Sequence, residues 1–208
     1  RTTTGDSGRG AVPHAPSAPT GKAPGTLASP AKARYGPGPM AKKADSRKIH
    51  FVSLGCAKNK VDSEVMLGVA ANAGLSITTD AEDAEIIVVN TCGFIGEAKK
   101  ESIDTILEMA ELKDGGRCKK LVVSGCLSQR HPAELSEEMP EVDHFLGSSD
   151  MLSLAKVLRG DAARMLVGNP AEWLVSASDP RVVSTGRASA YVKSVEGGFA
   201  RASTMDEP

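Results

Sequence analysis

Aromatic residues make up only 3% of this 208-residue chain, so any core must be built from Val, Ile, Leu, Ala and Met. No apolar run approaches the roughly 18 residues that a membrane-spanning helix needs, and we expect no membrane association. No short apolar segment preceded by positive charge indicates a secretory signal. Four cysteines are too few for a small disulfide-stapled fold. We therefore expect reduced thiols and a cytoplasmic location.

The net charge of −1 conceals two regions of opposite sign. Residues 1–47 hold eight Lys or Arg and two acids, a formal charge of +6. Residues 48–208 hold 17 Lys or Arg and 24 acids, a formal charge of −7. An acidic body is poorly suited to gripping a phosphate backbone, so we expect no direct nucleic-acid binding by this chain.

Residues 1–47 are rich in Pro, Gly, Ala, Ser and Thr and lack apolar periodicity. Such a segment cannot bury enough surface to offset the entropy lost on ordering, which predicts a disordered tail. The first methionine is Met40, which favours a natural start there and an upstream leader that is fused or mis-assigned. A targeting peptide is the alternative.

From Lys48 onward, β-branched runs alternate with helical patterns. Strands are predicted at KIHFVSLG, EIIVVN, KKLVVSG and VDHFLG, with shorter strand-like pieces at RMLVG and RVVSTG. Runs that are apolar on both faces indicate a parallel sheet covered by helices. We predict one α/β domain of flavodoxin-like type over residues 48–160. Residues 161–208 are predicted to be a linker and the incomplete start of a second domain.

Three helices are predicted within this domain. The first covers VDSEVMLGVAANAG, with Asp62 able to cap its start. The second covers EAKKESIDTILEMAELKDGG, and its expected apolar face consists of Ile103, Ile106, Leu107 and Ala110. The last covers SDMLSLAKVLRG and opens at Ser149 or Asp150.

Three of the four cysteines come directly after the ends of different predicted strands. These are Cys56, Cys92 and Cys126. Because the carboxyl ends of parallel strands lie along one edge of a sheet, we expect the three thiols to meet there. Cys118 precedes the third of these strands, which places it at the opposite edge.

Converging thiolates favour an iron–sulfur cluster, zinc or copper(I). A glycine beside each thiol (Gly55, Gly93, Gly125) lets the backbone approach a bulky group and donate N–H groups to it. Three protein ligands leave one position open, as a reactive centre requires. The residues alone leave two alternatives: the cysteines pack as small hydrophobes, or zinc takes His131 or His144 as a fourth ligand.

The runs SLGCAKNKVDSE, NTCGFIGEAKKESIDTI and SGCLSQR resemble the N-terminal domain of the radical S-adenosylmethionine methylthiotransferases. The resemblance extends over about residues 48–195. It implies that Cys56, Cys92 and Cys126 hold an auxiliary 4Fe–4S cluster whose open iron takes the sulfur or methylthio group being delivered. Cys118 matches none of the family's ligand positions.

Members of this family modify either adenosine in transfer RNA or an aspartate of a small-subunit ribosomal protein. SLGCAKNKVDSE and NTCGFI are similar to the ribosomal-protein branch, which implies that such a protein is the substrate. The alternatives are a fragment of a transfer-RNA enzyme and a stand-alone metal-binding module.

The chain departs from the family pattern near its end. In the family, AYVK and a glycine lead into a barrel whose C-x-x-x-C-x-x-C triplet binds the cluster that cleaves S-adenosylmethionine. Here the sequence reads AYVKSVEGGFARASTMDEP, Gly198 replaces the first of those cysteines, and no cysteine follows Cys126. We expect a chain truncated before the barrel and inactive by itself, with S-adenosylmethionine and a second 4Fe–4S cluster bound only in the full-length family. No residue is predicted to be a catalytic acid, base or nucleophile.

Overall fold

A computed structural model of the chain describes residues 46–170, 176, 178–185 and 190–193, all within the compact unit Pro37–Pro208. Residues 1–45 of the predicted tail, and residues 194–208, lie outside the described residues. Within the described part, no helix is long and apolar enough to cross a membrane.

The domain is built on a sheet of six parallel strands in the order β2-β1-β3-β4-β5-β6. The strands are β1 (Lys48–Ser53), β2 (Ser76–Thr78), β3 (Ile86–Thr91), β4 (Lys120–Gly125), β5 (His144–Leu146) and β6 (Met165–Leu166). The first five follow the flavodoxin-like order, so the predicted fold class is confirmed.

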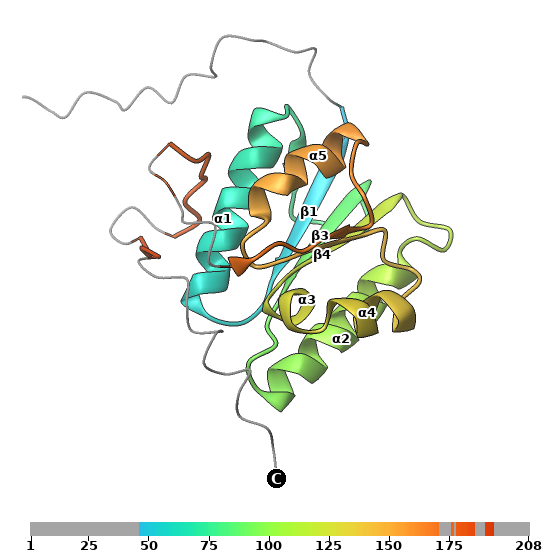
Figure 1. Cartoon of the computed structure of the whole chain (residues 1–208). Helices are drawn as coiled ribbons and strands as arrows, with labels where there is room; N and C mark the ends of the chain where they lie inside the picture. Colours follow the sequence, from blue (N-terminus) through green and yellow to red (C-terminus); the bar gives the residue numbers. More distant parts are fainter. Residues whose placement is uncertain (1–45, 171–175, 177, 186–189, 194–208) are drawn as a thin grey trace, which may run out of the picture. The chain divides into compact units, whose positions relative to one another are not determined.

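Helices cover both faces of the sheet. They are α1 (Ala57–Asn72), α2 (Gly96–Glu111), α3 (Cys126–Arg130), α4 (Pro132–Glu138), the 3-10 helix η1 (Met151–Ser153) and α5 (Leu154–Arg159). Figure 1 shows α1 and α5 on one face and α2, α3 and α4 on the other. This arrangement explains why the central strands are apolar on both sides.

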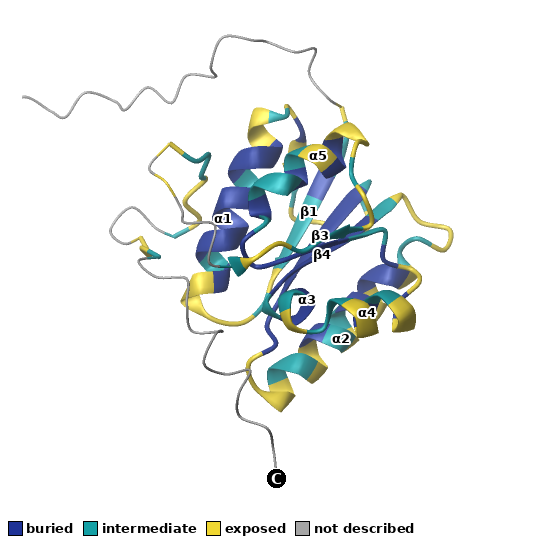
Figure 2. Ribbon diagram, viewed as in Figure 1, coloured by how far each residue is buried: buried dark blue, intermediate teal, exposed yellow. Residues whose placement is uncertain are grey.

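The sheet separates two hydrophobic cores. All six residues of β3 are buried, and Figure 2 shows the central strands as the most enclosed part of the molecule. Ile86 and Val88 belong to the core beneath α1 and α5, whereas Ile87 and Val89 belong to the core beneath α2 and α4. Alternate side chains of a strand point to opposite faces, so short β-branched runs supply both cores without aromatic residues.

Two details of the predicted helices are wrong. Asp62 does not cap α1, because the helix begins at Ala57 and Cys56 occupies the N-cap position. Leu107 is 46% exposed, and Met109 is buried in its place on the inner face of α2. The last helix opens as a 3-10 turn with Asp150 at its N-cap, one of the two positions predicted.

The structure contains elements that the sequence patterns did not reveal. β2 and α3 are too short to show a period. The strand-like piece predicted at RMLVG is confirmed: it contains β6, which pairs with β5. The domain end predicted at residue 160 stays a prediction. Residues 181–185 of the RVVSTG run form no strand; they lie against α1 instead.

Candidate metal centre

The three cysteines predicted as ligands lie at the carboxyl ends of neighbouring strands. Cys56 is the N-cap of α1 after β1, Cys92 follows β3 directly, and Cys126 opens α3 directly after β4. The chain leaves β1 toward β2 on one side and returns as β3 on the other, so this is the switch point of the sheet. We call this side of the sheet the cysteine edge and the opposite side the amino edge.

Close backbone contacts join the three cysteine loops. A Cβ atom placed on Gly55 would lie 2.7 Å from Cys92 Cβ and 3.1 Å from Cys92 Sγ. A Cβ atom placed on Gly93 would lie 2.8 Å from Leu127 Cα and 3.3 Å from the carbonyl carbon of Cys126. The loop holding Cys56 therefore contacts Cys92, and the loop holding Cys92 contacts Cys126.

Asn59 ties the three loops together from the first turn of α1. Its side chain is 1% exposed, and Nδ2 donates hydrogen bonds to the carbonyl oxygens of Leu54 (3.0 Å) and Thr91 (2.7 Å). Cys126 Sγ lies 3.4 Å from Asn59 Oδ1 and donates to it. The sequence reasoning missed this residue; the only signal was an uncharged amide between two lysines, just past a strand.

Gly125 makes the abrupt turn from β4 into α3 possible. Its φ of +103° and ψ of −158° lie in a region that only glycine adopts readily. A Cβ atom there would also lie 2.4 Å from both Asn90 Oδ1 and the Thr91 carbonyl oxygen. The glycine is needed for conformation and for space, and it sets Cys126 at the very start of the helix.

The thiols differ in exposure and influence one another electrostatically. Cys56 is exposed, Cys92 is buried and Cys126 is half-buried. The pKa of Cys126 is raised to about 11, chiefly by burial and to a smaller extent by Cys92, Cys56 and Asp62, whereas Lys193 acts to lower it. Without a metal, Cys126 is therefore protonated at neutral pH, and ligation would release its proton.

Cys118 lies at the amino edge, away from the other three. It is 4% exposed, packs in the core beneath α2, and its Sγ donates weakly to the carbonyl oxygen of Lys120 at 3.6 Å. Burial raises the pKa of this thiol as well. The prediction that Cys118 lies at the opposite edge is confirmed.

The described residues contain no group of three His, Cys, Asp or Glu side chains arranged to hold a single metal ion. The two histidines considered as a fourth ligand have other partners. His131 Nδ1 lies 3.1 Å from Glu134 Oε2, and His144 Nδ1 lies 3.0 Å from the Ala163 carbonyl oxygen at the amino end of β5. A zinc ion completed by His144 does not fit this geometry.

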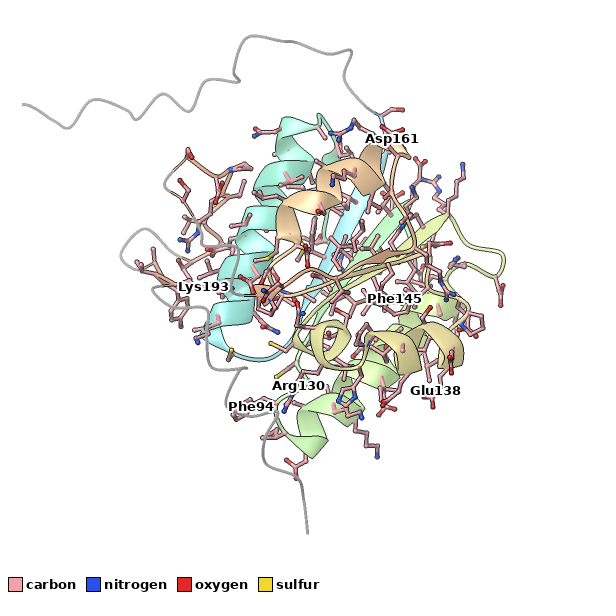
Figure 3. The ribbon with its side chains drawn as sticks, in the orientation of Figure 1. Phe94, Arg130, Glu138, Phe145, Asp161 and Lys193 are labelled. Carbon is pink, nitrogen blue, oxygen red and sulfur yellow. The ribbon has the colours of Figure 1, made fainter. Side chains whose placement is uncertain are left out.

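Two large apolar side chains flank the cysteine edge. Phe94 is 71% exposed and Ile95 is 56% exposed, directly after the Cys92–Gly93 pair. Arg130 Nη1 donates to the Gly93 carbonyl oxygen at 2.9 Å and so holds this loop against α3. Figure 3 shows Phe94 and Arg130 at the same end of the molecule.

Comparisons with known proteins identify relatives of the α/β domain. The protein-family model described as "Uncharacterized protein family UPF0004" matches residues 48–147. A protein of Sorangium cellulosum named ribosomal protein uS12 methylthiotransferase RimO is 74% identical over 152 residues, which is 73% of this chain and 31% of the relative. Proteins with the same name from Myxococcus xanthus and Caldicellulosiruptor saccharolyticus are 51% identical over 152 residues (73% of this chain, 32% of the relative) and 49% identical over 154 residues (72% of this chain, 35% of the relative).

The chain spans about a third of the length of the curated relatives that it matches. The residues that the family model matches contain strands β1 to β5 and the cysteine edge. The α/β domain of this chain therefore corresponds to the N-terminal domain of the methylthiotransferases, in the branch whose members are named ribosomal protein uS12 methylthiotransferases.

Proposed function

We propose that Cys56, Cys92 and Cys126 hold a 4Fe–4S cluster at the cysteine edge. The observation that carries the proposal is the contact between all three cysteine loops, with Asn59 bonded to two of them and to Cys126. The donor set is all thiolate, which suits iron–sulfur chemistry.

A cluster suits this arrangement better than a single ion does. Zinc requires its sulfur ligands within about 2.3 Å of one point. In a cluster each thiolate binds a different iron, so the sulfurs surround a larger group and need not converge. The described residues offer no single-ion group, yet three cysteine loops meet at one edge. This combination favours the larger group.

We propose further that the chain supplies this domain to an enzyme that transfers a methylthio group to ribosomal protein uS12, the substrate given in the names of its relatives. The auxiliary cluster would supply the sulfur. S-adenosylmethionine and a second 4Fe–4S cluster would bind to parts of such enzymes outside the matched region. Since the printed sequence has no cysteine after Cys126, this chain alone would not generate the radical. A ribosomal-protein substrate implies a cytoplasmic location.

Anaerobic reconstitution with iron and sulfide tests the cluster. We expect about four iron and four sulfide per chain, with the broad visible absorbance of a 4Fe–4S centre. Cys56→Ala, Cys92→Ala and Cys126→Ala should each lose most of the iron. Cys118→Ala is the matched control, because it removes a buried thiol from the amino edge and should keep the iron of the unchanged chain.

The outcomes separate the alternatives. Zinc without sulfide after anaerobic purification would support a stand-alone metal-binding module and contradict the cluster. Equal iron loss in Cys118→Ala and Cys92→Ala would contradict the ligand assignment. Release of deoxyadenosine from S-adenosylmethionine by the pure chain would contradict its proposed inactivity.

A further inference from the structure

Helix α1 carries two buried acids that the cluster proposal does not use. Glu64 is 1% exposed and Asp62 is 2% exposed. Both pair with bases far away in the sequence, Glu64 with Arg181 and Asp62 with Lys193. The described residues 180–185 and 190–193, here called the connector, thus lie against this helix.

Both carboxylate oxygens of Glu64 accept hydrogen bonds from the connector. Its Oε2 accepts hydrogen bonds from Arg181 Nε (2.9 Å) and Nη2 (2.6 Å), and its Oε1 accepts from the Ser184 amide and hydroxyl, both at 2.8 Å. The Val182 amide donates to the backbone carbonyl of Glu64 at 2.9 Å. Arg181 also donates to the Tyr191 carbonyl oxygen at 2.7 Å and so links the two described pieces of the connector.

Asp62 anchors the far end of the connector. The carboxylate lies 2.6 Å from Lys193 Nζ, and both side chains are 3% exposed. Figure 3 shows Lys193 beside α1. Residues two apart on a helix project about 200° from one another, so the connector contacts two different sides of α1. Such a pair of buried, charge-assisted bonds fixes register as well as position.

Gly68 allows the connector to approach the helix closely. A Cβ atom on Gly68 would lie 2.5 Å from the Arg181 amide nitrogen and 2.5 Å from the Pro180 carbonyl carbon. Backbone fits here only because the side chain is missing. A glycine inside a helix costs about 1 kcal/mol relative to alanine, a cost that this contact explains.

The contacts run toward the cysteine edge. Along the connector they pass from Gly68 to Glu64 and then to Asp62, which brings the chain closer to Cys56 at the start of α1. At 1.5 Å per residue, Asp62 lies only about 9 Å along the helix from Cys56. Lys193 is also near enough to influence Cys126 electrostatically.

We propose that α1 is a docking site for the connector, and that the docked connector holds Lys193 beside the cysteine edge. The docking itself requires no metal.

Amide hydrogen exchange by NMR on the whole 208-residue chain tests the docking. In the unchanged chain, the Val182 and Ser184 amides should be protected, and nuclear Overhauser contacts should join Lys193 to Asp62. Gly68→Ala should raise exchange at both amides at least tenfold and remove those contacts, while β3 stays protected. Gly96→Ala is the matched control, since its Cβ atom would meet no atom within 4 Å.

Unchanged protection in Gly68→Ala would overturn the proposal, as would missing Lys193–Asp62 contacts in the unchanged chain. If Gly68→Ala also loses protection in β3, the whole domain is destabilised, and Arg181→Met then tests the docking instead. That variant removes the donors to Glu64 and Tyr191 without adding a clash. A tenfold faster exchange at Ser184 supports docking, and unchanged exchange contradicts it. Iron is absent from every measurement, so failure of the cluster proposal is seen separately.

Discussion

The two edges of the sheet are stabilised in different ways. At the amino edge, charges are paired near the surface: Asp83 binds Lys48 and also Arg117 at 2.6 Å, and Lys113 lies 2.8 Å from Asp143. The cysteine edge relies instead on glycine turns, on a buried amide and on backbone contacts closer than any side chain would permit.

Unpaired polar groups are also unevenly distributed. In the described part of the chain, four buried side-chain atoms lack a hydrogen-bond partner: Asn90 Oδ1, Ser124 Oγ, Ser148 Oγ and Ser149 Oγ. All four lie near the carboxyl ends of β3, β4 or β5. Each buried polar group without a partner costs free energy. Among the described residues, this cost falls at the cysteine edge and not at the amino edge.

Replacing one positive-φ glycine at each edge should reveal the largest difference. Gly115 at the amino edge (φ +88°) has no atom within 4 Å of its Cβ position, so Gly115→Ala should cost about 1 kcal/mol, from backbone strain alone. Gly125→Ala adds a clash with Asn90 and Thr91 and should cost about 4 kcal/mol. Urea unfolding followed by circular dichroism measures both. Equal decreases in the free energy of unfolding for the two variants would show that the close contacts around Gly125 do not add to the cost of the substitution.

Removing the amide that joins the cysteine loops should have the next largest effect. Asn59→Ala leaves the carbonyl oxygens of Leu54 and Thr91 without this donor, which should lower the free energy of unfolding by about 3 kcal/mol. Asn72→Ala, at the exposed end of the same helix, should change it by less than about 0.5 kcal/mol. The same denaturation measurement applies. A loss in Asn72→Ala as large as that in Asn59→Ala would contradict a special role for the buried amide.

The smallest difference concerns pH. Burial raises the pKa of Asp62 from 3.8 to about 6, so the folded state binds this proton more tightly than the unfolded state. The stability from this group is fully present below pH 3.8 and is lost as the pH rises through 6. Between about pH 4.5 and 7 the loss should be about 2 kcal/mol. Urea unfolding at several pH values measures this loss, which should be absent in Asp62→Asn. If the free energy of unfolding of Asp62→Asn depends on pH as it does in the unchanged chain, the prediction is contradicted.

Asp83 at the amino edge provides the control of opposite sign. The hydrogen bond from Lys48 lowers the pKa of this carboxyl, and Arg117 lowers it further. Its contribution to stability is therefore present above the ordinary pKa and is lost as the pH falls through the lowered value. Asp83→Asn should remove a small decrease in the free energy of unfolding at acid pH. It should leave unchanged the decrease around pH 6 that Asp62 causes.

Much of the fold follows from local patterns. The runs EIIVVN and KKLVVSG predicted β3 and β4, because residues buried on both faces are apolar throughout. Their alternation with helices then predicted the parallel sheet and the edge where the thiols lie. The prediction for Leu107 was wrong because α2 has two overlapping apolar faces that share Ile106 and Ala110. One includes Leu107 and the other includes Met109, and helical period alone does not decide which of the two faces turns inward.

The candidate site was only partly predictable. The placement of Cys56, Cys92 and Cys126 at strand ends is visible in the sequence, whereas their capacity to hold a cluster stays a prediction. Asn59 gave no usable signal, because its partners Leu54, Thr91 and Cys126 become neighbours only when three strands assemble. Asp62 was wrongly predicted as a cap, since an acid near a helix start looks the same whether it caps or pairs.

The sequence by itself determined the α/β class, the position of each thiol relative to its strand, and the chemical character of the donors, because these depend on residues close together in the chain. Only the tertiary structure decided which loops touch, which polar groups are buried, and which acids pair with Arg181 and Lys193. Those contacts join residues up to 131 positions apart. They depend on the order in which strands and helices pack, and no local pattern encodes that order.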